Sequence, residues 1–268
     1  MSTQNRSFFR RIDIYFPWLK LVAVLVLGVL MILDLLDLTV PKVGDPYDKI
    51  KIAPMSKHVR STDRVLDGKR LVALTFDDGP SAATTPALLD ILAEKDVLAT
   101  FFMLGMMVRN NPELAVRIEK EGHDAVSHTM YHQNLARISP EAAEADILET
   151  KEVFKGVLGH KPSFARPPYG IFDGRVLGIM KTPAVLWSVD AEDWRHRDAD
   201  AIVSSVMSQI HDGAIILMHD IYASSVEAVP KLVDAAREAG YEFVTVSELA
   251  KYRGVDLVAG ETYYRLSP

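Results

Sequence analysis

The sequence predicts an α/β fold built on a parallel β-sheet, and the pattern of the chain after residue 70 carries this prediction. Short apolar runs alternate there with stretches of helical spacing, as strands and covering helices do in parallel sheets. Apolar runs without polar alternation are typical of strands buried on both faces. The composition, 49% hydrophobic and 25% charged, is that of a folded protein. A body of about 200 residues can form either an open sheet or a closed barrel.

Each predicted element has its own local pattern. The run LVALTF (71–76) is short and apolar, and VLATFFML (97–104) is rich in residues that favour strands. Residues 140–158 have the spacing of a long amphipathic helix. The predicted strands are 71–76, 97–104, 123–127, 163–166, 184–189, 214–218 and 243–246. The predicted helices are 85–95, 112–120, 140–158, 174–180, 199–210 and 226–239.

The apolar segment LVAVLVLGVLMIL (21–33) predicts an N-terminal transmembrane helix. At ~1.5 Å per residue it spans only ~20 Å of a ~30 Å hydrocarbon core. The apolar stretch extends back to Ile14, and Tyr15 and Trp18 suit the membrane interface. Basic residues precede the segment and acidic residues follow it. The positive-inside rule therefore places the amino terminus in the cytoplasm and the rest of the chain outside the cell.

Three regions follow from this pattern. We expect a cytoplasmic tail and membrane anchor at 1–38, an extracellular stalk with scattered prolines at 39–68, and a folded domain at 69–268. The predicted location is the cell membrane, with a single pass. One alternative is a cleaved signal peptide, which would secrete the protein, although no small-residue cleavage pattern follows the segment. Another is a buried helix of a soluble protein. A mature chain beginning after residue 38 would favour cleavage.

Composition excludes several classes of site. The chain has no cysteine, which excludes disulfides, thiolate metal sites and a cysteine nucleophile. A bound metal must therefore use histidine or carboxylate ligands. The net charge of −6 argues against nucleic acid as the main partner. The oligomeric state is not indicated.

Polar residues gather at the carboxyl ends of the predicted strands. They are Asp77 and Asp78, His128, Arg166, Asp190 and His219. In parallel α/β folds, ligands and catalytic groups gather at this end of the strands. The sequence therefore predicts one site formed from several segments.

Two of these segments suggest metal chemistry. Asp77 and Asp78 follow a strand and precede Gly-Pro, although a plain acidic turn or helix cap would also explain them. His128 and His132 lie four residues apart, a spacing at which two imidazoles can converge on a metal. With Asp78 they would leave open positions for water and substrate. Two solvated histidines on a helix remain the alternative.

Five segments together resemble the polysaccharide deacetylases of carbohydrate esterase family four, the NodB-homology proteins. They are TFDDGP (75–80), HTMYH (128–132), RPPYG (166–170), DAEDW (190–194) and LMH (217–219). The resemblance covers about residues 70–250. It implies a distorted (β/α) barrel with fewer strands than the eightfold barrel, about seven here, and a metal-dependent hydrolase acting on an acetyl amide.

The resemblance also implies roles for individual residues. Asp78, His128 and His132 would bind a divalent metal, zinc as the first choice and cobalt, nickel or manganese as alternatives. Asp77 would be the general base that takes a proton from water. Arg166 would pair with Asp77 and keep it ionised.

On the other side of the substrate, His219 would be the general acid that protonates the departing amine. Asp193 is the expected partner of this histidine, with Asp190 as the other candidate, because sequence spacing does not separate the two. Trp194 and Leu217 would form the walls of the pocket for the acetyl methyl group.

The segment RPPYG would stabilise the oxyanion. The backbone N–H of Tyr169 is the expected donor, and Pro167 and Pro168 would stiffen the loop that presents it. Thr129 would shape the loop between the two histidines by a local hydrogen bond.

The substrate follows from the expected location. A membrane-tethered enzyme outside the cell would reach cell-wall glycans, so N-acetylglucosamine of peptidoglycan is the first candidate. Chitin, an exopolysaccharide and O-acetylated xylan follow in that order. A non-catalytic glycan-binding protein is a further alternative, against which the complete set of motif residues argues.

Overall fold

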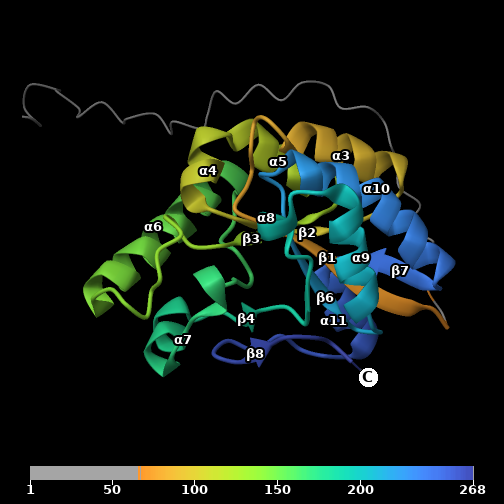
Figure 1. Ribbon diagram of the computed structural model, residues 1–268. Coiled ribbons are helices and arrows are strands. Elements are labelled where there is room, and N and C mark those ends of the chain that lie inside the picture. The colour runs from red at the N-terminus through yellow and green to blue at the C-terminus, as the bar shows by residue number, and fades with distance from the viewer. Residues whose placement is uncertain (1–65, 67, 268) are drawn as a thin grey trace, which may run out of the picture. The chain divides into compact units, whose positions relative to one another are not determined.

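The computed structural model describes residue 66 and residues 68–267 (Figure 1). The predicted membrane anchor and nearly all of the predicted stalk lie outside the described residues. Within the described part of the chain, no helix is long and apolar enough to cross a membrane. The anchor, the domain boundaries and the location at the membrane therefore stay predictions.

A parallel sheet forms the centre of the fold, with β1 (Arg70–Asp77) in its middle. The order is β3-β2-β1-β6-β5, and β7 pairs with the amino-terminal half of β1 while β2 pairs with the other half. The remaining strands of this sheet are β2 (Thr100–Met103), β3 (Asp124–Ser127), β5 (Val189–Asp190), β6 (Ile215–His219) and β7 (Tyr241–Val244). Since all pairings are parallel, the strands end on the same side.

Beyond β3 the sheet curls into an irregular barrel. Single bridges join Ser127 to Ala165 and Ala165 to Ala184. They lead to β4 (Ala184–Val185), which pairs with β8 (Thr262–Tyr263) and is followed along the chain by β5. Strand pairing therefore continues from β5 through β6, β1, β2 and β3 to the bridges of Ala165 and then to β4. Because β4 and β5 are consecutive along the chain, the last strand of this series lies near the first. This α/β arrangement agrees with the expected distorted barrel.

The predicted strands in this part of the barrel were wrong in detail. The predicted strand 163–166 has only the bridges of Ala165. The predicted strand 184–189 is divided into β4 and β5, because its ends pair with different neighbours. The strand β8 was not predicted.

The helices agree more closely with the sequence pattern. The helices predicted at 112–120, 140–158 and 174–180 have these bounds in the structure. Three short helices, α4 (Gly105–Asn110), α8 (Asp193–His196) and α11 (Val246–Arg253), were not predicted. The helices are α3 (Thr85–Glu94), α4 (Gly105–Asn110), α5 (Pro112–Lys120), α6 (Pro140–Leu158), α7 (Gly174–Met180), α8 (Asp193–His196), α9 (Ala199–Gln209), α10 (Ala223–Glu238) and α11 (Val246–Arg253). In Figure 1, α10 lies against α9 and α3 on one side of the sheet, and α6 lies with α7 on the other.

The core holds the strands rigidly beneath the site. One cluster fills the barrel, with Phe102, Val126 and Ile215 among its fully or nearly fully buried members. A second cluster packs α6 against α7 and the segment around Leu135. Burial of such side chains stabilises each by about 1.5–3 kcal/mol. Side chains at the strand ends are therefore carried by a well-packed frame.

Candidate active site

The two aspartates occupy a tight turn at the end of β1. Asp77 is the last residue of the strand, and Asp78 has a positive φ of 78°. The next residue, Gly79, lies against the carboxylate of Asp220, and a Cβ at this glycine would be 2.1 Å from Asp220 Oδ2. Only glycine fits this approach. The turn that aims Asp78 therefore depends on a neighbour from the end of β6.

The histidine loop follows β3 and is held at several points. The backbone N–H of His128 donates to the carbonyl of Met103 at 2.8 Å, and that of Gly105 donates to the carbonyl of Thr129. The N–H of Met130 donates to Asp146 Oδ1 at 2.7 Å. Contrary to expectation, the hydroxyl of Thr129 has no hydrogen-bond partner among the described residues. Ser127 Oγ instead accepts from the N–H of Thr129.

These segments bring Asp78, His128 and His132 together, with one ligand atom from each within 4.8 Å of the others. Asp78 Oδ1 lies 3.6 Å from His128 Nε2 and 3.4 Å from His132 Nε2. Ligand atoms in a tetrahedral site with ~2.1 Å bonds lie about 3.4 Å apart. Both distances from Asp78 Oδ1 are therefore close to those between ligand atoms around a divalent cation.

The state of the ligand atoms also fits a cation. Asp78 Oδ1 is buried and has no hydrogen-bond partner among the described residues, which is costly unless a cation satisfies it. His128 Nδ1 lies 2.8 Å from the carbonyl oxygen of Arg166, so we assign the proton to Nδ1 and the free lone pair to Nε2. Burial lowers the pKa of His128 to about 3, although the charge of Asp78 opposes this. The imidazole is therefore neutral, as a ligand must be.

Asp77 and Arg166 form a buried ion pair beside this cluster. Arg166 is fully buried, and its Nη1 donates to Asp77 Oδ1 at 2.7 Å. Its other N–H groups donate to Thr75 Oγ1 and to the carbonyls of Val185 and Leu186. Each of the three guanidinium nitrogens donates at least one hydrogen bond, and the charged group holds the Asp77 carboxylate in one orientation.

The pKa of Asp77 reflects two opposed effects. Burial raises the pKa of this carboxyl above its usual value, while the charges of Arg166 and His219 lower it. The expectation that Arg166 keeps Asp77 ionised therefore describes only part of the balance. A raised pKa makes the carboxylate a stronger base, and a divalent cation nearby would favour its ionised form.

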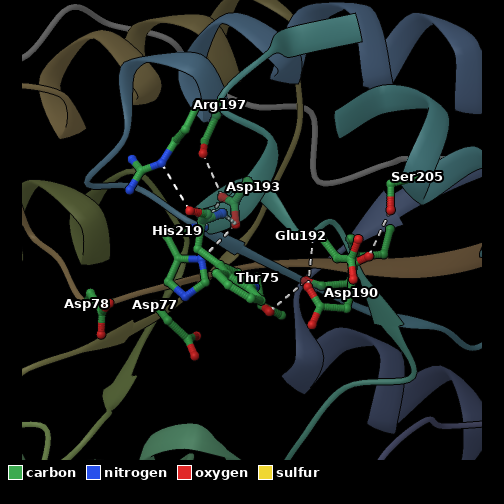
Figure 2. Close-up of polar contacts among 12 residues, drawn as sticks. Thr75, Asp77, Asp78, Asp190, Glu192, Asp193, Arg197, Ser205 and His219 are labelled. Carbon is green, nitrogen blue, oxygen red and sulfur yellow. Dashed lines mark hydrogen bonds and ion pairs between the residues drawn. The ribbon is translucent and has the colours of Figure 1, made fainter. Parts of the chain in front are cut away.

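His219 is the last residue of β6. It pairs in register with Asp77 across β1 and β6. Its Nδ1 lies 2.8 Å from Asp193 Oδ1, and its backbone N–H donates to Asp193 Oδ2. Figure 2 shows the imidazole between Asp193 and the pair Asp77 and Asp78. Asp190 makes none of these contacts and accepts instead from the N–H of Glu192. Asp193 is therefore the partner of His219.

The environment favours a protonated His219. Burial lowers the pKa of this imidazole, but its hydrogen bond to Asp193 and the charges of Asp193, Asp77 and Asp78 outweigh burial and raise the pKa to about 9. Its ring therefore carries a proton at neutral pH that it can donate from Nε2.

Replacing Asp193 by asparagine should lower the pKa of His219 from about 9 to ~6.5 or below, because the neutral amide removes the main charge that opposes burial. An NMR titration of the histidine ring would measure this change. Asp190→Asn is the matched control, since Asp190 is partly buried nearby without contacting the ring. Equal His219 pKa values in both variants would contradict the assignment of Asp193 as the partner.

The remaining predicted residues lie at the rim of the site. Tyr169 has a positive φ of 61° in the turn η1 (Pro168–Gly170), and its ring contacts that of His132 with 4.5 Å between centroids. The N–H groups of Gly170 and Ile171 donate to the carbonyls of Pro167 and Pro168, whereas within the described residues that of Tyr169 has no backbone acceptor. It is free to bind an oxyanion.

The predicted acetyl pocket stays a prediction. Leu217 is buried in β6, and Trp194 is 51% exposed in α8. The backbone N–H of Trp194 donates to Asp193 Oδ1, which places the main chain of Trp194 beside the His219–Asp193 pair. Neither residue lines the cavity next to His132.

Three positioning residues were not predicted from the sequence. Asp146 holds the histidine loop from α6, and Ser225 donates to Asp193 Oδ2 at 2.6 Å. Asp220 is fully buried, accepts from Thr85 Oγ1 at 2.6 Å and abuts Gly79. The sequence does contain a signal that Asp146 has a structural role. This acid lies on the apolar face of a helix, between Ala143 and Ile147, which are buried.

Comparison with known proteins agrees with this geometry. Residues 65–183 match the family described as polysaccharide deacetylase. The chain is 40% identical to the peptidoglycan-N-acetylmuramic acid deacetylase PdaC of Bacillus subtilis over 185 residues, 69% of this chain and 40% of that protein. It is 38% identical to a peptidoglycan-N-acetylglucosamine deacetylase of Bacillus cereus over 200 residues, 72% of this chain and 93% of that protein.

A solved structure described as T48 deacetylase with substrate is 41% identical to the chain, with a TM-score of 0.70 over 73% of this chain and 96% of that one. The chain spans less than half the length of the first curated relatives that it matches, 40% and 44%.

Proposed function

Since the chain belongs to the polysaccharide deacetylase family, we propose that it hydrolyses N-acetyl groups on a cell-surface glycan, with N-acetylglucosamine of peptidoglycan as the first candidate. The observation that carries this proposal is the two-sided site. The cluster of Asp78, His128 and His132 lies beside the buried carboxylate of Asp77, and His219, which is protonated, pairs in register with Asp77 from the neighbouring strand β6. Amide hydrolysis requires such a base and acid together.

The family is metal-dependent, and the donor set fits a cation. Asp78, His128 and His132 would hold it, with zinc as the first candidate and cobalt, nickel or manganese as alternatives. When bound, a divalent cation supplies Lewis acidity that acidifies water and polarises the acetyl carbonyl.

Asp77 acts on the attacking water. Its carboxylate takes one water proton as the water oxygen forms a bond to the carbonyl carbon. Arg166 holds the carboxylate by the 2.7 Å hydrogen bond to Oδ1, which leaves Oδ2 for the proton. The backbone N–H of Tyr169 donates a hydrogen bond to the oxygen on which negative charge develops.

His219 completes the reaction. The bond from carbon to nitrogen breaks as Nε2 of His219 donates its proton to the nitrogen, so the sugar leaves as a neutral amine and acetic acid remains, which keeps the second water proton and ionises to acetate in solution. Asp193 orients the ring and stabilises the imidazolium beforehand. One proton is taken by Asp77 and one is given by His219, so the reaction is balanced.

The substrate is proposed on two grounds. Named relatives deacetylate N-acetylglucosamine or N-acetylmuramic acid of peptidoglycan. The apolar segment 21–33 predicts an anchor that would place the domain beside the cell wall. Chitin, an exopolysaccharide and O-acetylated xylan are the alternative substrates.

Acetate release from N-acetylated glycan fragments tests the proposal. We expect release by the untreated protein, loss of release after treatment with a chelator, and recovery on addition of zinc, because the three ligands need the cation to act on the substrate. Enzymatic quantification of acetate measures all three. Release that persists after complete removal of metal would contradict the mechanism, and no release from any fragment would contradict the function.

A further inference from the structure

A pocket of about 630 Å³ opens beside the metal cluster. His132 and Tyr169, whose rings are in contact, are among the residues that line it. Its volume is within the range of about 300–1,000 Å³ that is usual for ligand sites. A glycan with its acetamide at the cluster would therefore have its neighbouring sugar at or in this pocket.

The pocket presents two kinds of surface. Tyr169 and Ile171 are 60% and 42% exposed, and they offer an apolar wall against which the C–H face of a sugar can pack. Gln133 and Asn134 add amide groups that can bond to hydroxyls. Such a combination suits a carbohydrate.

Arg137 adds a positive charge to this surface. It is the one arginine or lysine among the residues that line the pocket. No carboxylate of the described residues lies within ion-pair distance of its guanidinium. By contrast, Arg109, Arg166 and Arg253 each contact a carboxylate. The charge of Arg137 is therefore available to a ligand.

The turn that carries Arg137 is well ordered by its contacts. The N–H of Arg137 donates to the carbonyl of Asn134 at 2.9 Å, and the buried side chain of Leu135 anchors the turn in the core. From behind, Arg175 donates to the carbonyls of Leu135 and Ile138. Because the backbone is held by these contacts, the position from which the Arg137 side chain leaves the main chain is fixed beside the pocket.

We propose that this pocket binds an acidic substituent, a carboxylate on the sugar next to the one that is deacetylated, and that Arg137 is its specificity-determining contact. The inference rests on the proposed deacetylase function and narrows its substrate to acidic glycans. N-acetylmuramic acid without a stem peptide carries a free lactyl carboxylate and meets this requirement, and chitin, which is neutral, does not.

Three tetrasaccharides of equal length test this assignment. The first alternates N-acetylglucosamine and N-acetylmuramic acid without stem peptides, so that its lactyl carboxylates are free. The second is its methyl ester, and the third is chitotetraose. The full chain with zinc bound should have the highest kcat/KM on the free carboxylate.

Arg137→Gln should lower kcat/KM on the free carboxylate by about ten- to a hundredfold, mainly through KM, and leave the ester and chitotetraose unchanged. Arg137→Lys should keep most of the preference because it keeps the charge. Lys161→Gln removes one positive charge outside the pocket and is the matched control, expected to change none of the three rates.

Two results would overturn the assignment: an equal loss on all three substrates in Arg137→Gln, or no loss on the free carboxylate. Acetate release from none of the three by the unchanged protein would overturn the proposed function itself, and the inference with it.

Discussion

Asp77→Asn is expected to lower the rate of acetate release by about 10²–10⁴-fold while the metal stays bound. Asparagine has the shape of aspartate and keeps an oxygen for Arg166, which donates to Asp77 Oδ1 at 2.7 Å. It loses the carboxylate that accepts a proton from water. The three expected ligands, Asp78, His128 and His132, are unchanged. Initial rates and zinc content of the same preparation measure the two effects.

His128→Ala is the comparison for this prediction. It removes an imidazole whose Nε2 faces Asp78 Oδ1, so both bound zinc and acetate release should be lost. If Asp77→Asn kept a near-normal rate, Asp77 would not be the base. If it lost zinc as His128→Ala does, Asp77 would belong among the ligands.

The pH dependence of the unchanged protein follows from the same pair of residues. Asp77 accepts a proton only when it is ionised; burial raises its pKa and a bound divalent cation lowers it, so the rate should fall in acid as this carboxyl takes up its proton. His219 donates a proton only below its pKa of about 9. The rate should therefore be highest between these two limits.

Elements with strong local signals were predicted well from the sequence. The helix α6 begins after Ser139, whose side chain accepts from the N–H of Ala142, and ends at Gly159 in the left-handed conformation. Such caps are visible in the sequence. The helix α11 was missed although Thr245 and Glu248 form a capping box, because the β-branched residues before it extended the predicted strand to 246.

Elements that depend on distant partners could not be predicted in the same way. The segment around Ala165 has only single bridges to β3 and β4, and its backbone pairs according to the curvature of the barrel. The motif residues were recognised by resemblance. The choice between Asp190 and Asp193 was left open, because it depends on how the turn after β5 folds: Asp193 contacts His219 and Asp190 faces the N–H of Glu192.

The residues that position the site, such as Asp220, also depend on partners that are distant in the sequence. Asp220 directly follows His219 in the sequence, yet its contact with Gly79 joins residues far apart in the chain. Burial raises the pKa of Asp220 to about 7, with the hydrogen bond from Thr85 acting against it. Spacing alone indicates neither the contact nor the burial, since both arise from the pairing of β1 with β6.

Arg166→Met is expected to have the largest effect on stability. Methionine is unbranched like arginine and fills the space of its aliphatic part, but it ends near the position of Nε and lacks the guanidinium that now covers Phe102 at 3.9 Å. The variant leaves Asp77 buried without its cation, which should lower the free energy of unfolding by about 3–5 kcal/mol. Urea unfolding followed by circular dichroism measures this, with chelator present so that metal binding does not contribute.

Arg109→Met is the matched control, because it separates burial from ion pairing. Arg109 and Glu149 have the same 2.7 Å distance between nitrogen and oxygen as Arg166 and Asp77, but their side chains are 42% and 37% exposed instead of 0% and 4%. A solvated pair contributes only ~0–1 kcal/mol. Similar losses in both variants would show that burial of Asp77 is not the cause.

The pH dependence of the stability of Arg166→Met checks independently whether the buried charge of Asp77 causes the loss of stability. Arg166 lowers the pKa of Asp77, so its removal raises the folded-state pKa of this carboxyl further above the unfolded value. A group with a raised pKa in the folded state binds its proton more tightly there, and the folded state gains stability as pH falls through that pKa. The difference in unfolding free energy between Arg166→Met and the unchanged protein should therefore shrink from pH 7 to pH 5. Adding Asp77→Asn to Arg166→Met should remove this pH dependence, because no buried charge is then left to neutralise.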